Sequence, residues 1–191
     1  MALPSERERY TFADVLTWDE SERIELIDGE AVMMAPPSRM HQKISFEIGR
    51  QIGNYLEGKK CEVYLAPFGV RLFEQDGDTP EDVDTMVEPD ISVVCDNSKL
   101  DHLGCKGAPD MVIEVLSPSS LRHDRLVKLG LYQRAGVREY WIVDPKNKAV
   151  QVFLRDGGGS LKIHEEYGPR DVAKVNVLDG CFVELGKVFT E

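Results

Sequence analysis

The sequence predicts an α/β or α+β fold in which a mixed β-sheet is flanked by helices on both sides. Three observations predict it: a helix-period stripe of isoleucines within residues 38–56, two short apolar runs at 89–95 and 109–116, and a second helical pattern followed by an apolar strand at 138–144. The chain has 191 residues, which suits one domain spanning 1–191.

The N-terminal third predicts a short helix, a hairpin and a long helix. Thr11 is a suitable N-cap for a helix over residues 12–20. Apolar residues then alternate on both sides of Asp28-Gly29, which is a strong two-residue hairpin signal. Ser38 begins the long helix, and Gly58 ends it. Its buried stripe repeats every four residues and comprises Ile44, Ile48, Ile52 and Leu56.

The middle of the chain predicts strands and one loop. Residues 61–73 form one or two strands, and the acidic segment 74–88 is expected to be an exposed loop whose acids do not follow the calcium-loop pattern. The runs 89–95 and 109–116 both begin near Pro-Asp and have the length of buried strands. A helix capped by Ser119 or Ser120 ends at Gly136. A C-terminal hairpin over 151–167 turns at three consecutive glycines.

The composition bounds the function. Lysine plus arginine number 23 and aspartate plus glutamate 34, so the net charge is −11, the wrong sign for a protein that coats nucleic acid nonspecifically. No stretch has the roughly 20 apolar residues that span a bilayer, and the first residues lack the apolar core of a signal peptide. We therefore expect a cytoplasmic protein whose four cysteines are reduced thiols.

Glu114 is the most informative residue, because it lies within the apolar run MVIEVL. A lone buried charge costs several kcal/mol unless a partner compensates it. Asp90 stands at the entrance of the preceding apolar run. If the two strands are neighbours, these carboxylates converge at one edge of the sheet, where hard oxygen ligands favour Mg²⁺ or Mn²⁺.

A cation follows on the next helix. Asp124 and Lys128 lie four residues apart and share a helix face, in a stretch that holds five bases and one acid. Carboxylates, a metal ion and a lysine together form a plausible clamp for a phosphoryl oxygen.

Structural interpretations stay open for each of these residues. Glu114 could form an ion pair with Arg122 or Lys128, and Lys128 alone would usually be a solvated helix residue. Asp110 is best interpreted as a turn residue. His41 is more often a hydrogen-bonded structural residue, and Glu47 would normally face solvent. The cysteines and Asp101-His102 lack the spacing of a zinc site.

The segments EPDISVV, PDMVIEVLSPSS and RHDRLVKLGLYQRAGVREYWIVDP resemble the Uma-type family of bacterial restriction endonucleases, within the PD-(D/E)XK nuclease superfamily. The resemblance covers most of the chain. It implies a restriction-endonuclease-like core with extra N-terminal and C-terminal hairpins, and Mg²⁺-dependent hydrolysis of DNA phosphodiester bonds.

The same resemblance implies roles for individual residues. Asp90 and Glu114 would bind the metal, with the Val115 carbonyl as a further ligand. Glu47 on the first core helix and His41 would be supporting residues. The superfamily's usual lysine lies two residues after the strand acid, and that position is Leu116 here. We expect Lys128 to replace it from the next helix, with Asp124 beside it.

Two functions follow from the sequence. The first is a metal-dependent endonuclease that acts on DNA as a homodimer, because double-strand cutting needs two active sites. The second is a catalytically silent binding or assembly domain that retains the nuclease scaffold, which the acidic charge and the absent strand lysine favour.

Overall fold

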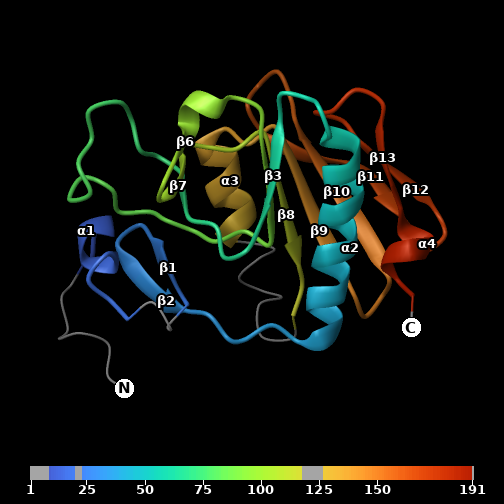
Figure 1. The fold of residues 1–191 in the computed structure, drawn as a ribbon, viewed down its shortest axis with the longest axis horizontal. Coiled ribbons are helices and arrows are strands. Elements are labelled where there is room, and N and C mark those ends of the chain that lie inside the picture. Colours follow the sequence, from blue (N-terminus) through green and yellow to red (C-terminus); the bar gives the residue numbers. More distant parts are fainter. Residues whose placement is uncertain (1–8, 20–22, 118–126, 191) are drawn as a thin grey trace.

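The computed structural model describes residues 9–19, 23–117 and 127–190, and Figure 1 shows a central sheet with helices on two sides. Six strands form this sheet in the order β11-β10-β9-β8-β5-β3. β8 and β9 are parallel and all other neighbours are antiparallel. The bounds of the six are β3 (Glu62–Leu65), β5 (Ile91–Val94), β8 (Met111–Val115), β9 (Glu139–Asp144), β10 (Ala149–Arg155) and β11 (Leu161–Tyr167). The predicted mixed α+β class is therefore confirmed.

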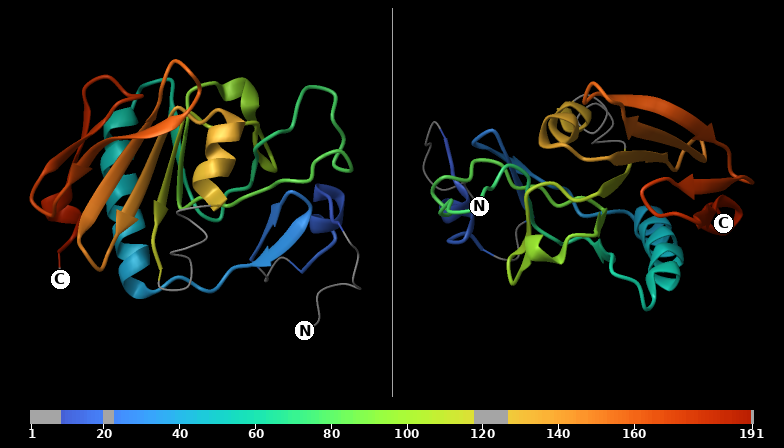
Figure 2. Two further views of the ribbon diagram at one scale, coloured as in Figure 1. Left: turned by 180° about the vertical axis from the view of Figure 1, so that it is seen from behind. Right: turned by 90° about the horizontal axis from the view of Figure 1, so that it is seen from above.

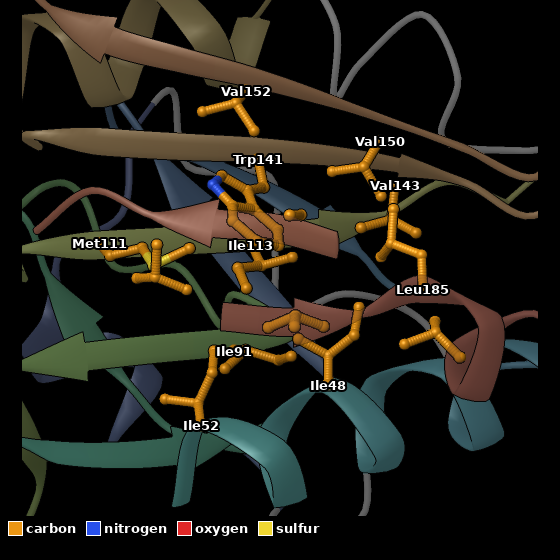
Figure 3. Close-up of a cluster of buried hydrophobic side chains, with 14 of the residues drawn as sticks. Ile48, Ile52, Ile91, Met111, Ile113, Trp141, Val143, Val150, Val152 and Leu185 are labelled. Atoms are coloured by element: carbon orange, nitrogen blue, oxygen red, sulfur yellow. The ribbon is translucent and has the colours of Figure 1, made fainter. Parts of the chain in front are cut away.

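Helix α2 (Arg39–Leu56) covers one face of the sheet. Ser38 caps it by accepting a hydrogen bond from the His41 N–H, as the sequence predicts. Its isoleucine stripe faces the apolar residues of β5, β8 and β9, and Figure 3 shows Ile48 and Ile52 directed towards Ile91, Ile113 and Trp141. This face is a continuous apolar core.

Helix α3 (Leu129–Ala135) covers the opposite face, as the view from above in Figure 2 shows. Gly136 ends it in the left-handed conformation at φ 94°, which a residue without a Cβ adopts at little cost. Leu131 and Tyr132 pack against Val112, Tyr140 and Ile142 in a second apolar cluster. The predicted start of this helix lies outside the described residues.

The N-terminal residues form a small unit beside the sheet, built from α1 (Phe12–Val15), β1 (Ile24–Ile27) and β2 (Glu30–Met33). The predicted turn is confirmed: Asp28 and Gly29 both have positive φ, 48° and 81°, between the antiparallel strands. The hairpin binds the later segment 83–88, where Leu26 and Met86 exchange backbone hydrogen bonds.

This docking corrects one expectation. Residues 75–82 and Asp84 are exposed, but Val83, Met86 and Val87 are buried under the hairpin and the neighbouring strands. A small three-stranded sheet, β4 (Val70–Arg71), β7 (Gly104–Lys106) and β6 (Leu100–Asp101), with a 3-10 turn η1 (Asn97–Lys99), lies beside it.

A second correction concerns the cysteines. β3 and β5 pair so that Glu62 lies opposite Val94, which brings the flanking Cys61 and Cys95 together as a disulfide with Cα atoms 4.0 Å apart. The expectation of four reduced thiols is wrong for this pair, because the strand register that joins them is invisible in cysteine spacing. Cys105 and Cys181 are buried free thiols, as expected.

The chain also continues beyond the last predicted hairpin. β12 (Val172–Val175) and β13 (Cys181–Glu184) form a two-stranded sheet, and α4 (Leu185–Val188) follows. Their buried residues complete the α2 side of the core. Within the described part of the chain, every helix is too short or too polar to traverse a bilayer.

Candidate active site

Glu114 is the fourth residue of β8 and is buried, with 4% of its surface exposed. Successive strand residues face opposite sides, so Glu114 shares the α3 face with Val112 and Leu116. Its Oε1 accepts hydrogen bonds from Lys128 Nζ at 2.9 Å and from the Tyr132 hydroxyl at 2.5 Å. The acid is thus compensated, among the described residues, by the Lys128 ammonium and the neutral Tyr132 hydroxyl.

Lys128 immediately precedes α3, and its side chain is fully buried. Its Nζ also lies 2.8 Å from Oε1 of Glu25. An ammonium group removed from water is tolerated when close opposite charges and hydrogen bonds replace its hydration. Lys128 is therefore not a solvated helix residue; two carboxylates hold it in place.

Glu25 is a site residue that the sequence analysis missed. It lies in β1 with no exposed surface, and its Oε1 also accepts the Glu88 N–H at 3.0 Å. Its Oε2 is buried without a hydrogen-bond partner among the described residues. The signal was present, because Glu25 interrupts the apolar strand IELI just as Glu114 interrupts MVIEV.

Asp90 immediately precedes β5. Its Oδ2 accepts the Val115 N–H at 2.7 Å and lies 3.0 Å from Nε2 of His41, which comes from the first turn of α2. The pairing of Ile91 with Ile113 sets this arrangement, because it places the residue before β5 beside the end of β8. The predicted neighbourhood of the two strands is confirmed.

Asp90 and Glu114 take their side-chain partners from opposite sides of the sheet. His41, which contacts Asp90, belongs to α2, whereas Lys128 and Tyr132, which contact Glu114, precede and belong to α3. Both acids are nevertheless linked to the backbone at Val115. This residue directly follows Glu114, and its N–H donates to Asp90. A ligand common to both would lie at this strand end.

The electrostatics of the cluster are uneven. Burial, and then the charge of Glu114, raise the pKa of Tyr132 well above its ordinary value, so the phenol stays a protonated donor to Glu114. Glu25 and Glu114 bring two carboxyl groups to one ammonium group. Counted over the described residues alone, the cluster has more acidic than basic groups at the end of β8.

The remaining predicted residues lie in other settings. Glu47 binds Arg50 and Gln51 on its own helix, and the Arg50 hydrogen bond lowers the pKa of Glu47. Asp110 accepts the Cys95 N–H and binds Arg138, in keeping with its predicted turn role. Asp124 lies outside the described residues.

A divalent metal is implied by the resemblance, and the residues fit one. In the described part of the chain, no three His, Cys, Asp or Glu side chains are grouped as a metal site. Mg²⁺ commonly needs only one or two carboxylates and keeps several waters. Asp90, Glu114 and the Val115 carbonyl are hard oxygen donors, and Oε2 of Glu25 is a further buried oxygen that has no hydrogen-bond partner within the described ranges.

A mixed sheet with an acid at the entrance of β5, an acid within β8 and a lysine bound to the latter defines a nuclease-like fold of the restriction-endonuclease class. A family model described as "Putative restriction endonuclease", Uma2, matches residues 12–184. The chain belongs to this family.

Three relatives are similar to the chain over most of its length. Two of them are proteins of Synechocystis sp. PCC 6803 that are described as uncharacterized. The protein slr1290 is 27% identical, and the match covers 78% of this chain and 76% of slr1290. The protein sll1609 is 26% identical, and the match covers 83% of this chain and 88% of sll1609. A crystal structure of "a putative nuclease belonging to DUF820" from Anabaena variabilis aligns with a TM-score of 0.71 at 20% identity, over 94% of this chain and 97% of that one. This last match supports the fold.

Proposed function

We propose that this protein is a divalent-metal-dependent endonuclease that hydrolyses DNA phosphodiester bonds. The observation that carries the proposal is the contact between Lys128 and Glu114. A buried lysine lies 2.9 Å from the strand acid although the usual lysine position is Leu116. The family membership supports the same reaction class.

The residues have distinct roles in this proposal. Asp90, Glu114 and the Val115 carbonyl would hold Mg²⁺ or Mn²⁺, which supplies an activated water and offsets phosphate charge when bound. The Lys128 ammonium would stabilise the negative charge that develops on the phosphoryl oxygens. His41 orients Asp90, and Tyr132 orients Glu114, through the hydrogen bonds described above.

The proposal has two further parts. Glu47 and Asp124 keep their proposed supporting roles, Glu47 as the acid of the first core helix and Asp124 from its position four residues before Lys128. We also propose a homodimer, because cleavage of both DNA strands needs two active sites.

The variant Glu114→Ala tests the assignment. We expect cleavage of plasmid DNA with Mg²⁺ or Mn²⁺ to fall by about a thousandfold or more, the scale set by losing one essential transition-state contact. The fold should persist, although the metal-free free energy of unfolding should fall by about 1–3 kcal/mol, because Lys128 and the Tyr132 hydroxyl lose the carboxylate that they contact. Cleavage at the unaltered rate by a folded Glu114→Ala protein would refute the assignment.

The alternative, a silent binding or assembly domain, is favoured by one observation. Asp90 and Glu114 already have His41 and Lys128 as partners, on opposite sides of the sheet. Titration calorimetry separates the two functions. An endonuclease should bind Mn²⁺ at millimolar concentration or below, and lose that binding in Glu114→Ala; no heat of binding would favour the silent domain.

A further inference from the structure

Lys128 is not a residue of the strand that carries Glu114, so the backbone of that strand does not fix its position. A lysine two residues after the strand acid would be placed by the register of the sheet itself. Lys128 instead precedes α3, and its ammonium group lies at the end of a long side chain. Such a side chain has many rotamers, so a second contact is needed to hold its ammonium in one place.

Glu25 supplies this second contact. Its Oε1 lies 2.8 Å from Lys128 Nζ, and the pair is fully buried, with no exposed side-chain surface on either residue. Lys128 is therefore held between two carboxylates, one from the central sheet and one from the N-terminal hairpin.

Glu25 is itself fixed by the docking of that hairpin. The Glu88 N–H donates to its Oε1, and the adjacent Leu26 exchanges backbone hydrogen bonds with Met86. Arg23, at the start of the hairpin, binds the Glu88 carboxylate through two nitrogens at 3.0 and 3.1 Å. These contacts tie the hairpin to the segment that leads into Asp90 and β5.

The shared ammonium also affects the charge of Glu114. With a single carboxylate, the ammonium would neutralise Glu114 and oppose a cation there. Glu25 is a second partner of this ammonium, so among the described residues its charge is shared between two acids, and it neutralises Glu114 less than it would alone.

We propose that Glu25 is a positioning residue, which holds Lys128 at the displaced lysine site and leaves Glu114 available to a divalent cation. The N-terminal hairpin is then a working part of the active site. This inference rests on the proposed nuclease function, because it assigns Glu25 a role through Lys128.

The test is a double-mutant cycle of Glu25→Gln, Lys128→Met and the double variant, with kcat and KM measured on plasmid DNA and Mn²⁺ affinity measured calorimetrically without DNA. Glu25→Gln should lower kcat by about 10- to 100-fold, the scale of losing a residue that orients a ligand. KM should change little, and Mn²⁺ affinity should weaken about tenfold. In the Lys128→Met background, Glu25→Gln should have no further effect on kcat.

The matched control is Glu139→Gln, the same substitution at another fully buried strand glutamate with none of the cluster's partners. It should leave kcat and Mn²⁺ affinity per folded molecule unchanged. If Glu25→Gln matches the active wild type in both measurements, or if its effect adds fully to that of Lys128→Met, the inference is wrong. Absence of both Mn²⁺ binding and cleavage in the wild type would overturn the proposed function, and this inference with it.

Discussion

Two buried glutamates on neighbouring parallel strands show how differently the same residue can be used. Glu114 on β8 faces α3, and Glu139 on β9 faces the opposite side with Trp141. Glu139 accepts three N–H donors: Trp141 Nε1 at 2.7 Å, the Val177 backbone at 2.7 Å and Asn176 Nδ2 at 3.2 Å. Glu114 instead binds an ammonium and a phenol beside another carboxylate.

The partners, and not burial, distinguish the two sites. Neutral N–H donors satisfy the carboxylate of Glu139. One of them, the Val177 N–H, attaches the segment before β13 to the sheet, so Glu139 has a structural role. In the part of the chain that the structure describes, the Glu114 cluster contains two acids and one base, and Oε2 of Glu25 lacks a hydrogen-bond partner there. An excess of one charge in a buried cluster is the property expected of a site that binds a counter-charged ligand.

The largest effect is expected from Lys128→Met, which removes the buried ammonium that Glu25 and Glu114 both contact. The free energy of unfolding should fall by about 3–5 kcal/mol, because breaking a buried pair strands its partner charges. Cleavage should fall at least a hundredfold. Urea unfolding and a plasmid assay measure the two effects. Wild-type values in both would mean that the cluster carries neither stability nor function.

The contrast between the two glutamates also shows how far the sequence alone could predict the site. Glu114 was identified by its apolar neighbours, and Glu25 has the same setting in IELI. Their relation is not local, since Glu25 and Lys128 are 103 residues apart, and only the docked hairpin brings them together. Glu139, equally buried at the start of β9, shows that burial of an acid does not by itself indicate a functional site.

The fold was more predictable where local chemistry decides it. The isoleucine period set α2, and Asp28-Gly29 set the first hairpin. The burial of Val83, Met86 and Val87 and the Cys61–Cys95 disulfide were missed, because both depend on which distant segments pair. β12 and β13 were missed because their four-residue strands carry little periodic signal.

A smaller and purely structural effect is expected from Glu139→Gln. The glutamine amide keeps one acceptor oxygen, but its NH₂ group replaces the other and cannot accept. The N–H of Trp141 or of Val177 therefore loses its acceptor. The free energy of unfolding should fall by about 1–3 kcal/mol. Mn²⁺ affinity, compared at equal folded fraction, should not change. A loss of metal binding here would mean that Glu139 belongs to the functional site after all.

The smallest effect concerns Cys181, a buried thiol in the core on the Glu139 side. Burial, followed by the charge of Glu139, raises the pKa of Cys181 from 9.0 to about 11. The folded state therefore keeps a proton that the unfolded state releases above pH 9. The stability from this thiol is complete below pH 9 and is lost as the pH rises towards 11.

Cys181→Ala should remove that pH dependence. Between pH 8 and pH 10.5, the wild type should lose about 2 kcal/mol more unfolding free energy than the variant. Urea unfolding of both proteins at the two pH values measures the difference. Equal losses in the two proteins would show that the thiol does not titrate differently in the folded state. Cys105, whose pKa burial also raises to about 11, serves as the matched position on the other side of the sheet.

The central claim is that Asp90 and Glu114 share one divalent ion at the end of β8, with Lys128 beside it. A crystal of the protein with Mn²⁺, examined by anomalous diffraction, tests it most directly. The account predicts one anomalous peak within coordination distance of both carboxylates and near the Lys128 ammonium. A peak bound to neither acid, or carboxylates that stay on their separate sides of the sheet at saturating Mn²⁺, would contradict it.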